Sequence, residues 1–292
     1  MRAVEQITKG AGRLGVPLYS SRCSKHAYTQ HQLLVLVVLR QMLSKSYRDF
    51  VDWLGLMDSL WRRLRLRTMP HFTTLHKFSL RLEPHTLDGM VATLASSVVV
   101  EDVDAIIDST GMQSGNASFY YVRTMSLRAG SKGTYERAVR RHIKLTLVVD
   151  ARTMTILSML ATPGPDADFN KLVPALSKAV DAGFGIGTIS ADKGYDSESN
   201  RRFVRQELGA EAHIPLRQVG RRACDHHGFY RRRQRAVFDE RLYRRRSLVE
   251  TVNSMLKRTM SSTALARRER AQYAELALRA VAHNAKRAVE LG

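Results

Sequence analysis

Cysteine and long apolar runs are scarce in this sequence. Its 292 residues contain two cysteines, too few for the disulfide framework of a small secreted protein. The longest uninterrupted apolar run, Leu33 to Leu39, has seven residues, whereas a membrane-spanning helix needs about 20. The N-terminus lacks the apolar stretch of a secretory signal. These absences exclude a membrane-spanning or secreted class and predict a cytoplasmic protein.

Negative charge is also scarce, and it is unevenly distributed. Lys and Arg number 47 against 27 Asp and Glu, which gives a net charge of +20. Residues 1–100 carry a net charge of +8, residues 101–200 one of −1, and residues 201–292 one of +13. A large positive charge favours a polyanionic partner. The pattern predicts a carboxylate-bearing centre between two segments that bind nucleic acid, and so a nucleoid-associated protein. An ordinary core with unevenly charged surface is the alternative.

The sequence pattern changes near residue 100. Before it, apolar residues recur with helical spacing, which predicts a helical domain over 1–100. After it, short β-branched runs alternate with helical stretches, which predicts an α/β domain over 101–292 with a mixed sheet flanked by helices. A short basic insertion is expected at about 215–236. The expected strands cover 103–108, 143–150, 154–160, 186–191 and 211–215, and the main expected helices cover 29–43, 168–180, 237–260 and 266–290.

Three acidic residues stand where such a fold gathers an active site. Asp108 and Asp192 each end a predicted strand, and Glu250 lies in a predicted helix. Sites in open α/β sheets gather at the carboxyl ends of strands. Close carboxylates repel unless cations lie between them, and their oxygens suit Mg²⁺ or Mn²⁺. Two such ions about 4 Å apart serve phosphodiester chemistry. Taken alone, each position favours the ordinary interpretation, with Asp108 a turn residue at a strand end and Asp192 a loop residue.

The helix around Glu250 carries a polar stripe. Tyr243, Arg246, Glu250 and Lys257 are spaced by 3, 4 and 7 residues, so on one helix they fall within an arc of roughly 60°. A carboxylate with cations on both sides suits a metal site that receives phosphates. Solvated ion pairs along a helix explain the same spacing equally well.

The stripe resembles the Tyr–Arg–Glu–Lys signature of DDE transposases from bacterial and archaeal insertion sequences, in the group built on insertion sequences four and five. Ile106–Thr110 and Ala191–Ser197 resemble the segments that carry the first and second aspartate of that family. The separations between the three acidic residues, 84 and then 58 residues, also fit. The resemblance covers about residues 30 to 290.

This resemblance implies a ribonuclease H-like core preceded by a helical DNA-binding domain. It implies that Asp108, Asp192 and Glu250 are catalytic and hold two Mg²⁺ or Mn²⁺ ions. It also implies that Tyr243, Arg246 and Lys257 contact DNA near the scissile phosphate. The implied activity is hydrolysis at the ends of an insertion sequence followed by strand transfer to target DNA. The protein would work as a homodimer assembled on double-stranded DNA. Larger members carry a long β-rich insertion before the Glu, and this chain has only the segment at about 215–236.

Two further regions are candidates for DNA binding. The first is a predicted helix after Pro70, helix-turn-helix-like, with Thr73 or Thr74 as its N-cap. Its face with Thr74, Lys77 and Arg81 has the spacing of a helix that enters a groove. The alternative is a packed helix in a small helical domain.

The second region is a basic run, Arg217–Arg246, with 11 basic and 3 acidic residues. Its cluster of Arg231, Arg232 and Arg233 has the density expected for phosphate contacts. A solvated basic loop is the alternative.

Two other functions fit the sequence. A metal-dependent nuclease on the same fold would cut without joining strands. A non-catalytic DNA-binding regulator derived from a transposase would bind element ends only. The intact acidic triad argues against the regulator, whereas only the resemblance separates transposase from nuclease.

Overall fold

The computed structural model describes residues 2–23, 25–100, 102–115, 142–164, 166–217 and 228–292. The chain divides into two compact units. One unit combines Met1–Val98 with Met255–Gly292, and the other is Val99–Ser254. Residues 255–292 thus belong to the same unit as the N-terminal helices, whereas the expected second domain covered 101–292. Part of the expected basic insertion, residues 218–227, lies outside the described residues.

The first unit is built around its C-terminal helix, α14 (Glu269–Leu291), which contacts α6, α2, α1 and α5. The apolar run of α2 is buried from Leu33 to Val38. Thr29 begins α2 with a capping box, because its side chain accepts from Gln32 N and Gln32 Oε1 accepts from Thr29 N. The other elements of this unit are α1 (Arg2–Arg13), α2 (Gln30–Met42), α3 (Tyr47–Gly55), α4 (Asp58–Leu64), α5 (Phe72–Arg81), α6 (Pro84–Ala95) and β6 (Thr263–Ala264).

The helix expected after Pro70 is α5, but its N-cap differs from the prediction. His71 is the cap, and its ring nitrogen accepts from Thr73 N. Thr73 and Thr74 are therefore inside the first turn. Pro84 occupies the first turn of α6. Proline has no backbone N–H, and at this position a helix has no acceptor for one, so no hydrogen bond is lost.

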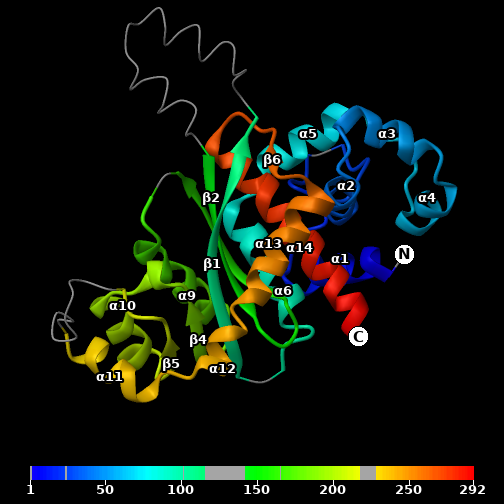
Figure 1. Ribbon diagram of the computed structural model, residues 1–292. Helices are drawn as coiled ribbons and strands as arrows, with labels where there is room; N and C mark the ends of the chain where they lie inside the picture. Colours follow the sequence, from blue (N-terminus) through cyan, green and yellow to red (C-terminus); the bar gives the residue numbers. More distant parts are fainter. Residues whose placement is uncertain (1, 24, 101, 116–141, 165, 218–227) are drawn as a thin grey trace, which may run out of the picture. The chain divides into compact units, whose positions relative to one another are not determined.

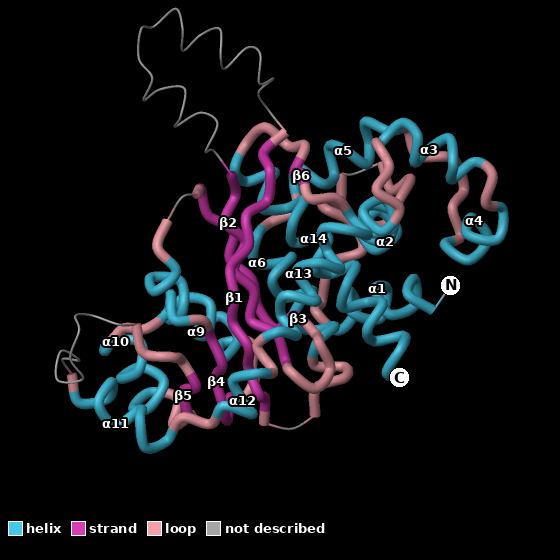
Figure 2. Tube along the Cα trace, viewed as in Figure 1, coloured by secondary structure: helices cyan, strands magenta, loops and turns pink. Residues whose placement is uncertain are grey.

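The second unit holds a sheet with the order β3-β2-β1-β4-β5 (Figure 2). The first two pairings, β3 with β2 and β2 with β1, are antiparallel. The next two, β1 with β4 and β4 with β5, are parallel. This is the mixed sheet that the sequence predicted. Its strands are β1 (Val103–Ser114), β2 (His142–Asp150), β3 (Ile156–Pro163), β4 (Ile186–Ala191) and β5 (Glu211–His213).

Helices lie on both faces of this sheet and at its β5 edge (Figure 1). Ser158 on β3 donates to Ala175 O of α9, so α9 packs on the face that carries Ser158. The cross-strand register puts Ile107 on that same face. On the opposite face, Ser190 donates to Leu242 O of α12. The helical elements are η1 (Asp168–Lys171), α9 (Leu172–Asp181), η2 (Lys193–Tyr195), α10 (Glu198–Arg202), η3 (Phe203–Glu207), α11 (Phe229–Val237), α12 (Glu240–Arg244) and α13 (Ser247–Met260).

Three sequence predictions for this unit are wrong in detail. Asp108 does not end a strand, because β1 continues to Ser114. Residues 229–235 form part of α11 instead of a loop. The helix expected over 237–260 is divided into α12 and α13 by a turn at Arg245 and Arg246. Within the described ranges, no helix combines the length and apolarity needed to cross a membrane.

Candidate active site

Strand register places Asp108 beside Asp192. Ile107 on β1 pairs in parallel with Ala191, the last residue of β4, and the two aspartates follow these partners directly. Asp192 keeps an extended backbone, with φ −71° and ψ 161°. Because neighbouring strands lie about 4.8 Å apart and side chains alternate between faces, both carboxylates leave the same face of the sheet. The predicted position of Asp192 at a strand end is confirmed.

The turn after β4 orients Asp192. Its Oδ1 accepts from Lys193 N at 2.7 Å and caps the short helix η2. Two residues after Asp192, a Cβ at Gly194 would lie 3.1 Å from Asp168 Oδ2, so a larger residue there would require the Asp168 side chain to shift. The turn after β4 therefore lies close to Asp168.

Asp108 is half-buried and short of compensating positive charge. Burial raises the pKa of its carboxyl to about 6, while a backbone hydrogen bond from Ser109 and the charge of Arg246 oppose the shift. The charges of Glu250 and Asp168 raise the pKa further. Asp108 therefore lies within electrostatic reach of two other carboxylates and would be stabilised by a nearby cation.

Arg246 is the cation shared by the three predicted acidic residues. Its Nη2 lies 2.9 Å from Glu250 Oε1. Burial alone would lower the pKa of Arg246, but Tyr243, Glu250, Asp192 and Asp108 together raise it. Its guanidinium carbon also lies 5.9 Å from the centre of the Tyr243 ring. The structure thus connects Tyr243, Arg246 and the three carboxylates in one neighbourhood.

Two contacts hold α12 and the following turn over the sheet. Arg245 Nη1 lies 2.8 Å from Asp104 Oδ2 on β1, and Thr188 on β4 donates to Asp104 Oδ1 at 2.9 Å. Ser190 on β4 donates to Leu242 O at 3.2 Å. Because Asp104 and Asp108 are four residues apart on one strand, they share a face. The contacts therefore deliver Arg246 and Glu250 to the face that bears Asp108.

The four residues of the predicted stripe do not lie on one continuous helix. Tyr243 is on α12, Arg246 is in the turn, and Glu250 is on α13. Lys257 lies seven residues after Glu250 in the part of α13 that belongs to the first unit. The ion pair of Arg246 with Glu250 survives the break, because the turn is a tight one in which Arg246 N donates to Tyr243 O.

The donor set fits a divalent cation. Three carboxylates supply hard oxygen ligands. Burial is the main cause of the raised pKa of Asp108, and the charge of Arg246 lowers that pKa, so a cation near Asp108 favours its ionised form. Among the residues that the structure describes, no three acidic, His or Cys side chains are gathered closely enough to hold a metal ion. Glu250 is instead exposed and turned to Arg246, so a cation would have to draw it back.

Two residues beside Asp108 escaped the sequence analysis. Asn253 on α13 donates from Nδ2 to Asp108 Oδ2 at 3.3 Å, and its own buried Oδ1 has no partner among the described residues. It follows Glu250 by three positions, so helical spacing could have revealed it. Asp168 on η1 forms an ion pair of 2.7 Å with the buried Lys144. No local sequence signal marks Asp168, because its neighbours come from distant parts of the chain.

The helix face predicted to enter a DNA groove is on α5. Thr74, Lys77 and Arg81 line an open groove on α5 together with Leu80. The apolar residues of the same helix turn are buried on its other side. The predicted face is therefore accessible within the first unit.

The arginine cluster on α11 is divided in two. Arg231 is nearly buried and lies 2.7 Å from Asp196 Oδ2. Arg232 and Arg233 are exposed. Arg231 therefore has a partner inside the protein, whereas its two neighbours face solvent.

Comparison with known proteins gives the family. A family model described as a transposase DDE domain matches residues 101–285, a range that includes all three carboxylates and Arg246. No curated protein matches the chain. Since the family model covers more than half of the 292 residues, the chain belongs to the transposase DDE domain family, and transposition is the function that this membership supports.

Proposed function

We propose that the protein is the DNA transposase of an insertion sequence, of the group built on insertion sequences four and five. It binds the terminal inverted repeats and hydrolyses a phosphodiester at each end. The freed 3′-OH then attacks a phosphodiester of target DNA, which joins the two strands and releases a 3′-OH on the target strand. The observation that carries this proposal is the ion pair of Arg246 with Glu250, together with the electrostatic interaction of Arg246 with Asp108 and Asp192, inside the range of the family match. The strand order supports a ribonuclease H-like core.

In this proposal, Asp108, Asp192 and Glu250 hold two Mg²⁺ or Mn²⁺ ions. Bound there, such ions activate the attacking oxygen and stabilise the leaving oxygen of a phosphodiester. Asp108 and Asp192 approach from adjacent strands, and Glu250 approaches from α13. Asn253 holds the carboxylate of Asp108 in place.

Arg246 forms an ion pair with Glu250. If Glu250 bound a divalent cation instead, the planar guanidinium of Arg246 would be free to bind the non-bridging oxygens of the scissile phosphate, for which its geometry is suited. Tyr243, which precedes Arg246 in the chain, and Lys257, which follows Glu250, also contact the DNA.

The remaining DNA contacts are divided between sequence choice and general affinity. Thr74, Lys77 and Arg81 read the element ends from a helical N-terminal DNA-binding domain. Arg232 and Arg233, with Arg231 behind them, follow the DNA backbone. Two copies assemble as a homodimer on the paired ends, and the protein associates with the nucleoid.

Cleavage of a labelled duplex tests the proposal. The duplex carries the inverted repeat that flanks the coding sequence, and Mg²⁺ starts the reaction. Asp192→Asn should abolish cleavage and leave end binding nearly intact, because Asn keeps the shape but not the charge that binds a cation. Asp181→Asn, at an exposed position on α9, is the matched control and should cut normally. Cleavage by the Asp192 variant would contradict the assignment.

Strand transfer separates the alternatives. A transposase joins a pre-cleaved end to a target plasmid, whereas a nuclease only cuts and a regulator only binds. A wild-type protein that cuts and never joins would establish the nuclease, and one that binds without cutting would establish the regulator.

A further inference from the structure

We propose that a second anion site, at the β5 edge of the sheet, binds one backbone phosphate of the DNA. Its lining side chains are Arg201, Val204, Arg205, Glu211, Tyr230 and Arg233. The proposal rests on the proposed function, because that function supplies the DNA. The site shares no residue with the cluster around Arg246.

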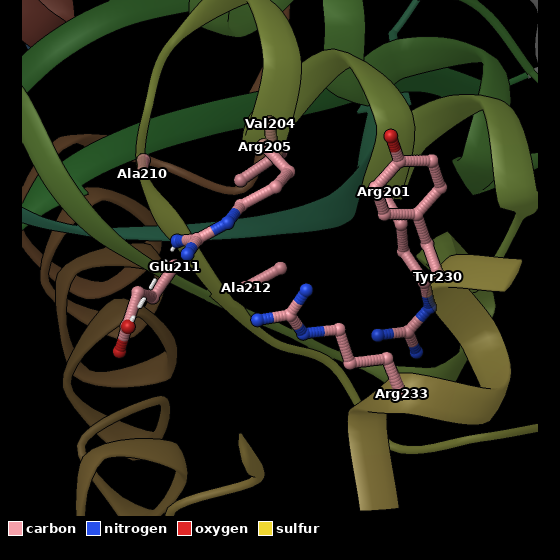
Figure 3. Close-up of a pocket in the computed structure, with 8 residues that line it drawn as sticks. All are labelled: Arg201, Val204, Arg205, Ala210, Glu211, Ala212, Tyr230 and Arg233. Carbon is pink, nitrogen blue, oxygen red and sulfur yellow. Dashed lines mark ion pairs between the residues drawn. The ribbon is translucent and has the colours of Figure 1, made fainter. Parts of the chain in front are cut away.

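Three chain segments converge on this pocket. Arg205 comes from η3, Glu211 begins β5, and Tyr230 and Arg233 come from α11. Figure 3 shows Arg205 and Arg233 reaching toward the same space from opposite sides. The floor is apolar, with Val204 and Ala210 buried. The cavity measures about 50 Å³, enough for a few water-sized groups and so for a phosphate group but not for a nucleobase with its sugar.

The lining carries an excess of positive charge. Arg201 is already neutralised, since its Nη2 lies 2.9 Å from the fully buried carboxylate of Asp196. Glu211 is the one carboxylate in the lining, and it lies 3.9 Å from Arg205 Nη1 in a solvent-exposed pair. Such a pair is worth little. Among the described residues, Arg233 has no ion-pair partner. One monoanionic phosphodiester between Arg205 and Arg233 would satisfy both guanidinium groups.

A buried network holds the walls in place. Asp196 lies between Arg201 and Arg231, and Glu198 accepts hydrogen bonds from Tyr230 N at 2.9 Å and Arg231 N at 3.1 Å. Glu198 thus caps the first turn of α11. A site whose walls are fixed before binding loses less entropy on binding than a flexible one.

The pocket lies a short distance from the proposed cutting site. Strand β5 is two places from β1 in the sheet, which is roughly 10 Å at the usual strand spacing. A DNA strand advances about 3.4 Å per nucleotide along its axis. The phosphate in this pocket is therefore expected a few nucleotides from the scissile one.

Salt dependence of DNA binding tests the proposal. Fluorescence anisotropy of the element-end duplex is measured at several salt concentrations in EDTA, so that no cleavage occurs. Each phosphate contact contributes about 0.9 to the log–log slope. Arg205→Gln and Arg233→Gln should each lower the slope, and the double variant should lower it by about 0.9 in total, because both side chains hold one phosphate.

The matched control is Arg202→Gln. Arg202 is exposed, comes from the same segment as Arg205 and lies outside the pocket lining, so its slope should equal that of the wild type. Circular dichroism of each variant confirms folding. A double variant with an unchanged slope, or with a loss of about 1.8 as for two independent phosphates, would overturn the shared site. If the wild type binds no DNA, the proposed function fails too. If the double variant cleaves normally and its slope is unchanged, only the proposed phosphate pocket is refuted.

Discussion

Arg246 Nη2 lies 2.9 Å from Glu250 Oε1, one turn before it on the chain. The negative charges of Asp108 and Asp192 also raise the pKa of this guanidinium. A protein side chain thus provides the positive charge that three neighbouring carboxylates require. This arrangement makes Arg246 a competitor for the place that a divalent cation would take.

Replacing Arg246 should therefore separate cation binding from catalysis. Arg246→Gln removes the competing charge, so Mn²⁺ should bind several-fold more tightly. Cleavage should nevertheless slow by about 10²-fold or more, because the guanidinium no longer binds phosphate. Mn²⁺ titration followed by electron paramagnetic resonance measures the first effect. Arg244→Gln, at an exposed residue of α12 two positions before Arg246, controls for net charge. Weaker Mn²⁺ binding by the Arg246 variant would refute this reading.

Asn253 should act through Asp108. Asn253→Ala removes the hydrogen bond to Asp108 Oδ2, so the concentration of Mg²⁺ for half-maximal cleavage should rise several-fold. A hydrogen bond to a charged group contributes about 1.5–3 kcal/mol, so some loss of stability is expected as well. Thr251→Ala, on an exposed position of the same helix, is the control. An equal loss of rate at every Mg²⁺ concentration would show that the role is structural only.

The groove on α5 should decide which DNA is chosen. Thr74→Ala combined with Lys77→Ala should reduce preference for the element's own ends over random duplex, because a good base contact provides roughly 1–3 kcal/mol of discrimination. A competition titration against random duplex measures this preference at two salt concentrations. His85→Ala, at an exposed position on α6, should keep the preference. A loss of affinity that is equal for both DNAs would show phosphate contact instead.

Acid should weaken the second unit through His213. Its Nδ1 accepts from Asp239 N at 3.2 Å, and burial lowers its pKa below the ordinary 6.5, against the opposing charges of Glu211, Asp239 and Asp104. As the pH falls below 6.5, His213 takes up a proton more readily in the unfolded chain than in the folded one. The stabilisation of the fold by neutral His213 is therefore complete above that pH and is lost as the pH drops. Urea unfolding of the wild type and of His213→Asn between pH 7.5 and 5 should show their difference narrowing in acid. A difference that stays constant with pH would contradict the assignment.

The sequence was most informative where local signals and the fold agree. Asp192 follows β4 directly because Ile186–Ala191 is a short β-branched and small-residue run with a polar turn behind it. Thr29 begins α2 because Thr and Gln stand at capping-box spacing. Such features depend on residues close together in the chain.

The misassigned elements depend on distant partners. The segment after Asp108 contains Ser109 and Gly111, which favour a strand only weakly, yet the ladder with β2 extends β1 through Gln113. The network of Asp196 with Arg201 and Arg231 spans 35 residues of chain, so sequence spacing could not show that Arg231 is held inside the protein. The return of residues 255–292 to the N-terminal helices is also set by packing on α14.

The three carboxylates are attached to the fold in unequal ways. Asp108 and Asp192 follow a pair of hydrogen-bonded strand residues, so their separation changes only if the sheet itself breaks. Glu250 is placed by the packing of α13, whose Val249 and Val252 are buried, and by the contacts of Arg245 with Asp104, Ser190 with Leu242 and Asn253 with Asp108. None of these contacts belongs to the strand ladder, so a change in them leaves the sheet intact. The site therefore has a fixed part, the two aspartates on neighbouring strands, and a part that can move independently of the sheet, the helix that carries Glu250.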